Sequence, residues 1–309
     1  MVRWCFVCKA FVKFTLTCLA LVIILQVNRY YQRVMNSFAL FKIVHVLPIE
    51  EEFAPPRLSN AEIQSIRSIL SQPFTAFAKG SQSFVFLSED GKYILKFNKF
   101  YSKFDSSWLQ SLPLFGWFDR GLQDSINNES EVLKRSFRSY LVAYQYFRDE
   151  TGMIYHHLQK SSSLHQKLLL IDKQGHRFNL EADDYAFIIQ KRGESTYQML
   201  GRLMENKEPE KASYYLEEIL RFSSKRLQKG IEDWDFKIKH NLGFIDGVAA
   251  QIDLGSLILN KEGLSLEQAQ EELKKGADEL RAWLVVKYPA LVPAWDASLE
   301  KVLLNVSSL

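Results

Sequence analysis

Residues 233–255 read DWDFKIKHNLGFIDGVAAQIDLG, a segment that predicts a β-hairpin flanked by polar side chains. Two apolar runs, residues 242–245 and 248–252, surround an Asp-Gly step at 246–247, which is the strongest short signal for a hairpin turn. Polar residues flank these runs: Asp233 and Asp235 precede them, Asn241 lies immediately before the first run and Asp253 immediately after the second. The segment therefore gathers carboxylates and one amide around a single hairpin.

An earlier part of the chain predicts three more strands, at residues 74–79, 84–87 and 93–97. The loop Gly80-Ser81-Gln82-Ser83 lies between the first two, and its glycine lets backbone N–H groups approach a phosphate. Val85 is expected to point into the concave face of the sheet. Because side chains alternate along a strand, Ile94 and Lys96 share a face, where the lysine can reach the phosphates of ATP while Ile94 covers an adenine.

Helices dominate the remainder of the chain. Residues 129–148 carry apolar side chains three and four positions apart, which predicts an amphipathic helix: Leu133, Phe137, Tyr140, Leu141, Tyr144 and Phe147. Further strands are expected at 167–171 and 185–190, and the chain beyond residue 195 reads mostly as helix. Strands followed by helices predict an α+β fold with two lobes.

These patterns, in this order, resemble the protein-kinase-like superfamily, which includes eukaryotic-type protein kinases and small-molecule kinases such as aminoglycoside phosphotransferases. The resemblance covers roughly residues 74–255. It implies a two-lobed kinase-like fold, in which an antiparallel sheet and one long helix form the N-lobe and helices form the C-lobe. It also implies ATP and Mg²⁺ as cofactors.

The resemblance assigns roles to single positions. Lys96 would contact the phosphates and pair with a glutamate of the following helix, with Glu129 preferred over Glu131, which falls on the solvent side. Asn241 and Asp253 would bind Mg²⁺ through their side-chain oxygens. Gly80 and Ser81 would lie over the phosphates, and the strand that ends at Gln190 would form the hinge whose backbone contacts adenine.

Departures from the family pattern leave the activity open. The family's base Asp lies five residues before the Asn, whereas Asp235 lies six and Asp233 eight residues before Asn241. The phosphate loop has one glycine rather than three, and no activation segment follows residues 253–255. These features favour a small-molecule or lipid-type kinase, an atypical protein kinase, or a pseudokinase.

Three functions therefore remain at this stage. The first is a membrane-anchored kinase that transfers the γ-phosphoryl group of ATP to an unknown hydroxyl acceptor, with Asp235 or Asp233 as base. The second is a catalytically inactive pseudokinase that acts as a membrane-tethered scaffold for a protein partner. The third is a membrane-tethered adaptor unrelated to kinases, in which Lys96 and Asp253 would be exposed and far apart.

The N-terminal region predicts a membrane anchor. Residues 10–27 are interrupted by one charge, Lys13, and as a helix they would be about 27 Å long, close to the roughly 30 Å hydrocarbon core. No small-residue cleavage site follows, so we expect a single-pass signal-anchor that contacts the lipid bilayer. Basic residues flank the segment on both sides, and the side of the membrane that holds the soluble part is therefore undecided.

Composition adds boundaries and exclusions. We expect an anchor at 1–30, a Pro- and Glu-containing juxtamembrane linker at 31–58, an N-lobe-like region with the hinge at 59–194 and a helical C-lobe-like region at 195–309. A net charge of +3 excludes nucleic acid as the main partner. All three cysteines lie in the first 18 residues, which leaves the rest without a thiol for zinc binding or nucleophilic catalysis.

Overall fold

The computed structural model describes residues 49–80, 83–99 and 115–306, together with isolated positions before residue 49. Within these ranges, the side chains of residues 79, 115–129 and 305–306 are not described. The chain divides into two compact units, Met1–Leu40 and Phe41–Leu309, and every element below belongs to the second. No helix within the described ranges is long and apolar enough to cross a membrane. The anchor expected at residues 10–27 lies, apart from isolated positions, outside the described residues and stays a prediction.

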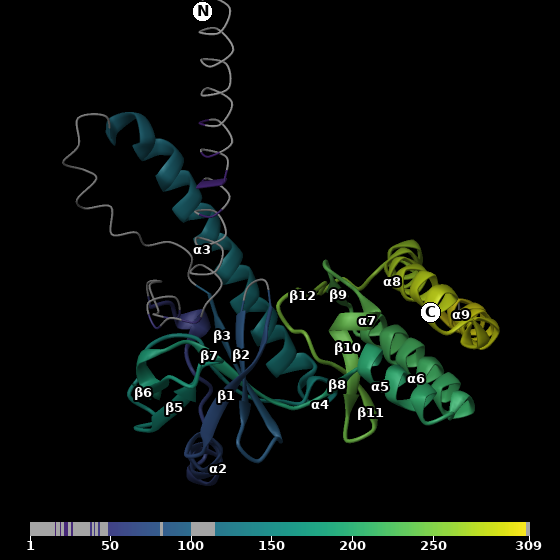
Figure 1. Cartoon of the computed structure of the whole chain (residues 1–309), viewed down its shortest axis with the longest axis horizontal. Helices are drawn as coiled ribbons and strands as arrows, with labels where there is room; N and C mark the ends of the chain where they lie inside the picture. The colour runs from purple at the N-terminus through teal and green to yellow at the C-terminus, as the bar shows by residue number, and fades with distance from the viewer. Residues whose placement is uncertain are drawn as a thin grey trace, which may run out of the picture. The chain divides into compact units, whose positions relative to one another are not determined.

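Seven strands form the first sheet, in the spatial order β4-β7-β3-β2-β1-β5-β6 (Figure 1). Neighbouring strands are antiparallel except β1 and β5, which run parallel. The strands are β1 (Pro73–Lys79), β2 (Ser83–Ser88), β3 (Tyr93–Asn98), β4 (Met153–His157), β5 (Lys167–Ile171), β6 (Arg177–Glu181) and β7 (Phe187–Lys191). The strands expected between residues 74 and 97 are confirmed, and Gly91 has the positive φ of 71° that suits its turn.

A long helix, α3 (Phe115–Tyr146), contacts both β4 of this sheet and the later strand β12 (Leu257–Leu259). Its apolar face is the predicted one, because Leu133, Phe137 and Tyr140 are buried. The helix begins well before residue 129, and it is followed by the short α4 (Arg148–Thr151), which ends at the left-handed Gly152. The α3 helix therefore connects the sheet to the second half of the fold.

Part of the segment predicted as a linker packs against α3. Phe53, in the short 3₁₀ helix η2 (Glu51–Phe53), is 1% exposed and lies edge-on to Phe137 with ring centroids 5.4 Å apart. Glu50 and Glu52 pair with Lys134 and Arg138 on the outer face of α3. The next helix, α2 (Asn60–Leu70), begins at a capping box formed by Ser59 and Glu62.

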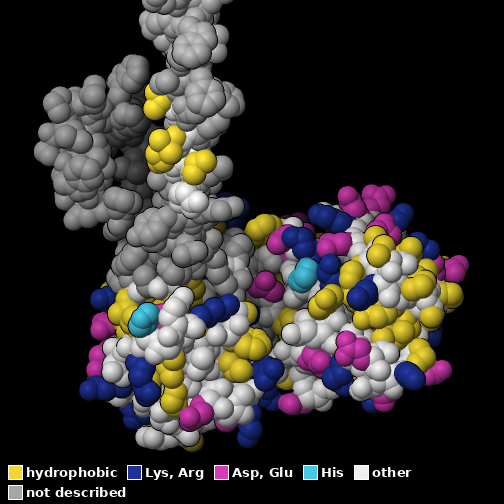
Figure 2. Space-filling model, in the orientation of Figure 1, with side chains coloured by type: hydrophobic (Ala, Val, Ile, Leu, Met, Phe, Trp, Pro, Cys, Tyr) yellow, Lys and Arg dark blue, Asp and Glu magenta, His cyan; other side chains and the backbone are white. Residues whose placement is uncertain are grey.

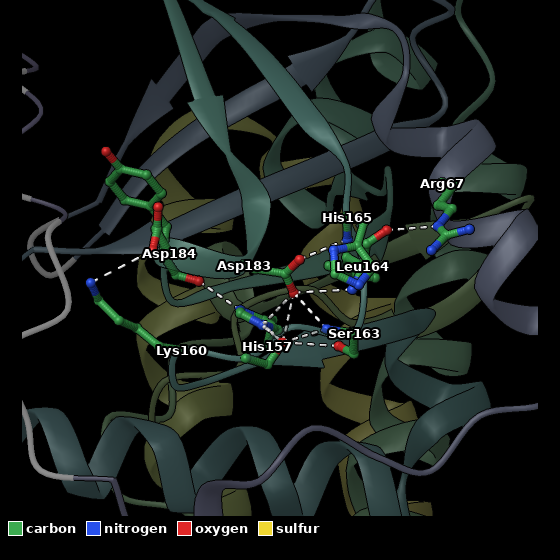
Figure 3. A network of polar contacts seen from close by, with 10 residues as sticks. Arg67, His157, Lys160, Ser163, Leu164, His165, Asp183 and Asp184 are labelled. Atoms are coloured by element: carbon green, nitrogen blue, oxygen red, sulfur yellow. Dashed lines mark hydrogen bonds and ion pairs between the residues drawn. The ribbon is translucent and has the colours of Figure 1, made fainter.

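The carboxylate of Asp183 ties the loop between β4 and β5 to the connection between β6 and β7 (Figure 3). Asp183, in the 3₁₀ helix η4 (Ala182–Asp184), accepts hydrogen bonds from the Ser161 hydroxyl and from three successive backbone N–H groups, those of Ser163, Leu164 and His165. Burial acts to raise the pKa of Asp183, but these hydrogen bonds outweigh it and lower the pKa. His157 extends the network through the Tyr185 carbonyl at 2.7 Å.

Helices and two small sheets form the rest of the chain. Strands β8, β10 and β11 make one sheet, and β9 pairs with β12 in another. The elements are β8 (Glu194–Ser195), α5 (Thr196–Glu205), α6 (Pro209–Gln228), β9 (Ile231–Asp233), α7 (Ile238–Asn241), β10 (Leu242–Ile245), β11 (Val248–Gln251), α8 (Leu266–Lys287), η5 (Pro289–Leu291) and α9 (Val292–Val306). The hairpin expected at residues 242–252 is confirmed, and the α+β class with it.

One hydrophobic cluster runs through both halves of the unit. It includes Phe137 of α3, Ile188 of β7, Leu220 of α6 and Trp295 of α9, all fully buried. The sheet and the helical region are therefore packed on a common core, and polar groups from both halves can meet where that core reaches the β10–β11 hairpin.

Candidate functional site

The register of the first sheet places four predicted residues on one face. Val85 of β2 lies opposite Lys96 of β3, and Ile94 lies opposite Gln190 of β7. Residues that pair directly across strands share a face, and so do residues two apart along a strand. Val85, Ile94, Lys96 and Gln190 therefore point to the same side, as the alternation in β3 predicts.

Lys96 crosses from this sheet to the segment that follows β11. Its Nζ donates a 2.7 Å hydrogen bond to the carbonyl of Ile252, 156 residues away in sequence. The pKa of Lys96 is below its usual range because burial disfavours the ammonium, while the nearby Asp253 carboxylate acts in the opposite direction. Lys96 and Asp253 are thus neighbours, which is the arrangement that the adaptor hypothesis lacks.

The two predicted metal ligands are tied together through the backbone. The Asn241 carbonyl accepts hydrogen bonds from the N–H groups of Ile252 and Asp253, at 2.8 and 3.1 Å. The Asn241 side chain is buried, and its amide nitrogen donates to Asp233 Oδ2 at 3.2 Å and to the Asp235 carbonyl at 2.9 Å. The Asp253 side chain is exposed. The hairpin therefore brings an oriented amide and an exposed carboxylate to its open end.

Asp233 is the structural centre of this cluster. Its carboxylate is 2% exposed and accepts four hydrogen bonds. Oδ2 accepts from Asn241 Nδ2 and Gln251 Nε2. Oδ1 accepts from the Asp235 N–H and Ser256 Oγ, and the four distances range from 2.5 to 3.2 Å. A buried carboxylate with four donors holds its surroundings in place and is poorly available to an external hydroxyl.

Asp235 has the opposite environment. Its side chain is 52% exposed and forms an ion pair of 2.8 Å with Lys237, whose pKa is raised by that hydrogen bond and charge. Trp234, between the two aspartates, is also exposed at 52%. Of the two aspartates that the spacing left open, Asp235 is therefore the one that an acceptor molecule can approach.

Gln190 and the glutamates of α3 are placed as follows. Gln190 is 2% exposed, and its Nε2 donates to the carbonyls of Thr151 and Gln251, so this side chain joins the sheet to β11. Glu131 is exposed and interacts with Lys134 and Arg138, on the solvent side as expected. The Glu129 side chain lies outside the described residues, and its pairing with Lys96 stays a prediction.

The loop at residues 80–83, predicted to lie over the phosphates, is described only at its ends. Gly80 is exposed. Its N–H donates to the Ser83 carbonyl at 3.1 Å, and its own carbonyl accepts a hydrogen bond from Lys99 Nζ. Ser81 lies outside the described residues. Lys99, 8% exposed, is a cation near this loop that the sequence patterns did not indicate.

A cavity of about 510 Å³ lies beside the segment that joins β7 to α5. Its lining residues come from β1, this segment, α5, α6 and the β10–β11 hairpin: Phe77, Arg192, Gly193, Glu194, Gln198, Met199, Arg202, Tyr215, Phe244, Asp246 and Gly247. Gly193 contacts the side chain of Ile252, since an added Cβ would lie 2.6 Å from it. Ile252 therefore connects Gly193, which lines the cavity, to Lys96, which donates to its carbonyl, and the cavity and the polar cluster are adjacent.

Sequence patterns missed several residues of this region. Phe77 follows no distinctive motif, and its ring is covered by the Arg192 guanidinium at 5.3 Å. In the sequence, Gln251 and Ser256 have the pattern of ordinary strand and turn residues. In the structure, both side chains donate hydrogen bonds to Asp233. The hairpin pattern was the one available signal, because it predicted that residues near 251 would lie beside residues near 241.

The predicted donor pair, one amide and one carboxylate, suits a hard cation. Within the described residues no group of three His, Cys, Asp or Glu side chains converges on a metal site. The amide nitrogen of Asn241 is held by Asp233 and Asp235, which orients the amide and directs its oxygen away from them. Oxygen donors of this kind suit Mg²⁺ shared with phosphates.

No protein-family model matches the chain, and no curated protein matches its sequence. Among solved structures, the chain is similar to the bifunctional kinase-methyltransferase WbdD, with 12% identity, a TM-score of 0.33 and coverage of 71% of this chain and 43% of that one. It is also similar to Rv3197 from Mycobacterium tuberculosis, solved with erythromycin, with 16% identity, a TM-score of 0.32 and coverage of 77% and 60%. The chain spans less than two thirds of either protein. These values are low, and the contacts of this chain's own residues carry the functional proposal.

Proposed function

We propose that this chain has a kinase-like fold, binds Mg-ATP and transfers the γ-phosphoryl group to a hydroxyl acceptor. One observation carries the proposal: Lys96, Asn241 and Asp253, from segments far apart in the chain, are joined through Ile252. Lys96 donates to the Ile252 carbonyl, and the Asn241 carbonyl accepts from Ile252 and Asp253. These hydrogen bonds bring Lys96 to the backbone that joins Asn241 and Asp253, which supports a role for the Lys96 ammonium on phosphate and for the side-chain oxygens of Asn241 and Asp253 on a metal.

The cavity supports a place for the nucleotide base. Its volume of about 510 Å³ falls in the usual range for small-molecule sites, and Phe77 and Phe244 offer apolar surfaces on different walls. A base bound there would direct its phosphates past Ile252 toward Lys96 and Asp253. Val85 and Ile94 lie on the same face of the sheet as Lys96 and would cover the bound nucleotide, with Gly80 and Ser81 near the phosphates.

The residues of this chain would act on the acceptor as follows. The exposed Asp235 carboxylate accepts the proton of the attacking hydroxyl, and Lys237 holds this carboxylate in place through the 2.8 Å pair. The oxygen–phosphorus bond to the acceptor forms as the bond to the leaving ADP breaks. Lys96 balances negative charge on the phosphates, and Asn241 and Asp253 would hold Mg²⁺, which neutralises charge as the phosphoryl group moves. Asp233 keeps the surrounding loop in position.

The second candidate is a pseudokinase scaffold, and one surface favours it. Figure 2 shows apolar side chains gathered over α8 and α9, where Val285, Val286 and Leu304 are 48%, 84% and 67% exposed. Exposed apolar patches are typical of protein-binding surfaces. In this alternative the fold and the predicted anchor at 10–27 supply a location at the membrane, and α8 and α9 supply a contact for a partner.

Calorimetric titration of the full-length chain with ATP, with and without Mg²⁺, tests the proposal. We expect saturable binding that requires Mg²⁺ and that Lys96→Ala and Asp253→Ala both weaken. Lys167→Ala is the matched control, because this lysine is 81% exposed on β5 and far from the cluster in the sheet order. A folded wild type that does not bind ATP overturns the enzyme proposal and leaves the scaffold.

A further inference from the structure

Ser139 in α3 uses its hydroxyl in an unusual direction. Buried helical serines ordinarily donate to the carbonyl four residues back, as Ser223 does to Ile219 at 2.8 Å in α6. Ser139 is 1% exposed, yet its Oγ donates out of the helix to the Leu254 carbonyl and accepts from the Leu257 N–H at 2.6 Å. One hydroxyl therefore binds two backbone groups of the segment that follows Asp253.

The same segment is also held by the Asp233 cluster. Ser256 Oγ donates to Asp233 Oδ1 at 2.5 Å, and the Ser256 carbonyl accepts from the Trp234 N–H at 3.2 Å. Residues 254–257 thus lie between α3 and the loop that carries Asp235. Movement of the Leu254 carbonyl would move Asp253, since the two residues are adjacent.

We infer that Ser139 is a positioning residue: it holds Asp253 so that the Asp253 carboxylate lies where Mg²⁺ would bind. This inference rests on the proposed function. Mg²⁺ requires near-octahedral oxygen ligands at about 2.0–2.1 Å, so a ligand on a loosened backbone binds it less well even when the fold is intact. Residues behind metal ligands commonly change metal affinity about 10- to 100-fold when removed. Ser139 therefore tunes the Mg²⁺ requirement of the site from a helix that provides no ligand itself.

The test compares Ser139→Ala with Ser223→Ala in the full-length chain. Both serines are buried in helices, but Ser223 donates within its own helix. The first measurement is backbone hydrogen exchange of residues 253–257, which does not depend on activity. The second is the Mg²⁺ concentration that gives half-maximal ATP binding in calorimetry.

For Ser139→Ala we expect faster exchange at the Leu257 amide and a half-maximal Mg²⁺ concentration raised about tenfold, with ATP binding restored at saturating Mg²⁺. Ser223→Ala should leave both measurements unchanged. Ser139→Cys keeps the size and a weaker donor, so it should give a smaller rise and is the decisive variant if the alanine protein does not fold.

Three results would contradict the inference in distinguishable ways. Unchanged exchange shows that Ser139 does not hold residues 254–257. Faster exchange with an unchanged Mg²⁺ midpoint shows a structural role only. A wild-type chain whose ATP binding does not depend on Mg²⁺ overturns the proposed function itself, and with it the metal in this inference, before any variant is compared.

Discussion

The two aspartates of the 233–235 segment should respond to the same substitution in opposite ways. Asp233→Asn and Asp235→Asn both replace a carboxylate by an amide of equal size. Asp233 is buried with four donors, whereas Asp235 is half exposed with one lysine. We therefore expect the first change to reduce stability and the second to abolish phosphoryl transfer while leaving stability almost unchanged.

The expected loss of stability in Asp233→Asn follows from the hydrogen bonds that the carboxylate accepts. The NH₂ group introduced by Asp233→Asn replaces one acceptor oxygen and meets either the Asn241 and Gln251 amides or the Asp235 N–H and the Ser256 hydroxyl. The hydroxyl can rotate and accept, so at least one hydrogen bond to a charged acceptor is lost. Each such bond contributes about 1.5–3 kcal/mol, which predicts a loss of at least about 1.5–3 kcal/mol in the free energy of unfolding. The exposed pair of Asp235 with Lys237 contributes at most about 1 kcal/mol.

Urea unfolding followed by tryptophan fluorescence measures the first effect, and ATP turnover with a library of hydroxyl acceptors measures the second. Circular dichroism serves as the folding control for both variants. Equal destabilisation of the two variants, or normal turnover by Asp235→Asn, would refute the assignment of a structural role to Asp233 and a proton-accepting role to Asp235.

Three further outcomes are expected. Burial lowers the pKa of His156 to about 4, so between pH 6.5 and 4 the unfolded chain binds a proton that the folded chain excludes. The free energy of unfolding, measured by urea titration, should therefore fall by about 3 kcal/mol as the pH is lowered over this range. His156→Phe should remove most of this pH dependence. Lys96→Met should reduce ATP affinity at least about tenfold because the charge for the phosphates is lost, and the urea midpoint should fall slightly because the hydrogen bond to the Ile252 carbonyl is lost as well; unchanged affinity would contradict its role. Asp183→Asn should lower the free energy of unfolding by about 2–3 kcal/mol and speed hydrogen exchange at Ser163, Leu164 and His165, whereas protected amides would show that the carboxylate is dispensable.

Local signals predicted most of the secondary structure. The Asp-Gly steps at 90–91 and 246–247 lie in the turns of the β2–β3 and β10–β11 hairpins, and the spacing of Leu133, Phe137 and Tyr140 predicted the buried face of α3. The start of α3 could not be predicted from the sequence in the same way. Its first turns, from residue 115, lack a regular apolar period, and the packing of Phe53 within the predicted linker depends on a contact with a distant helix.

In the candidate site, too, some relations between residues could be predicted from the sequence and others could not. Alternation in β3 placed Ile94 and Lys96 on one face, and the hairpin placed Asn241 near Asp253, because both relations depend on residues close in sequence. The choice between Asp233 and Asp235 was not accessible in this way. Their residue type is the same and their spacing from Asn241 fits neither pattern, and only burial and hydrogen-bond partners distinguish them.

Strand alternation, turn chemistry and helical periodicity thus determined the elements of this protein, and the order of the motifs along the chain indicated most candidate residues. Tertiary structure decided which of those residues meet: the contact of Lys96 with Ile252, the four donors on Asp233 and the hydrogen bonds of Ser139 to residues 254–257. The physical reason is that local preferences act over a few residues along the chain. Burial and hydrogen bonding at this site join β3, α3 and the β10–β11 hairpin, which lie far apart in sequence and are brought together by one shared core.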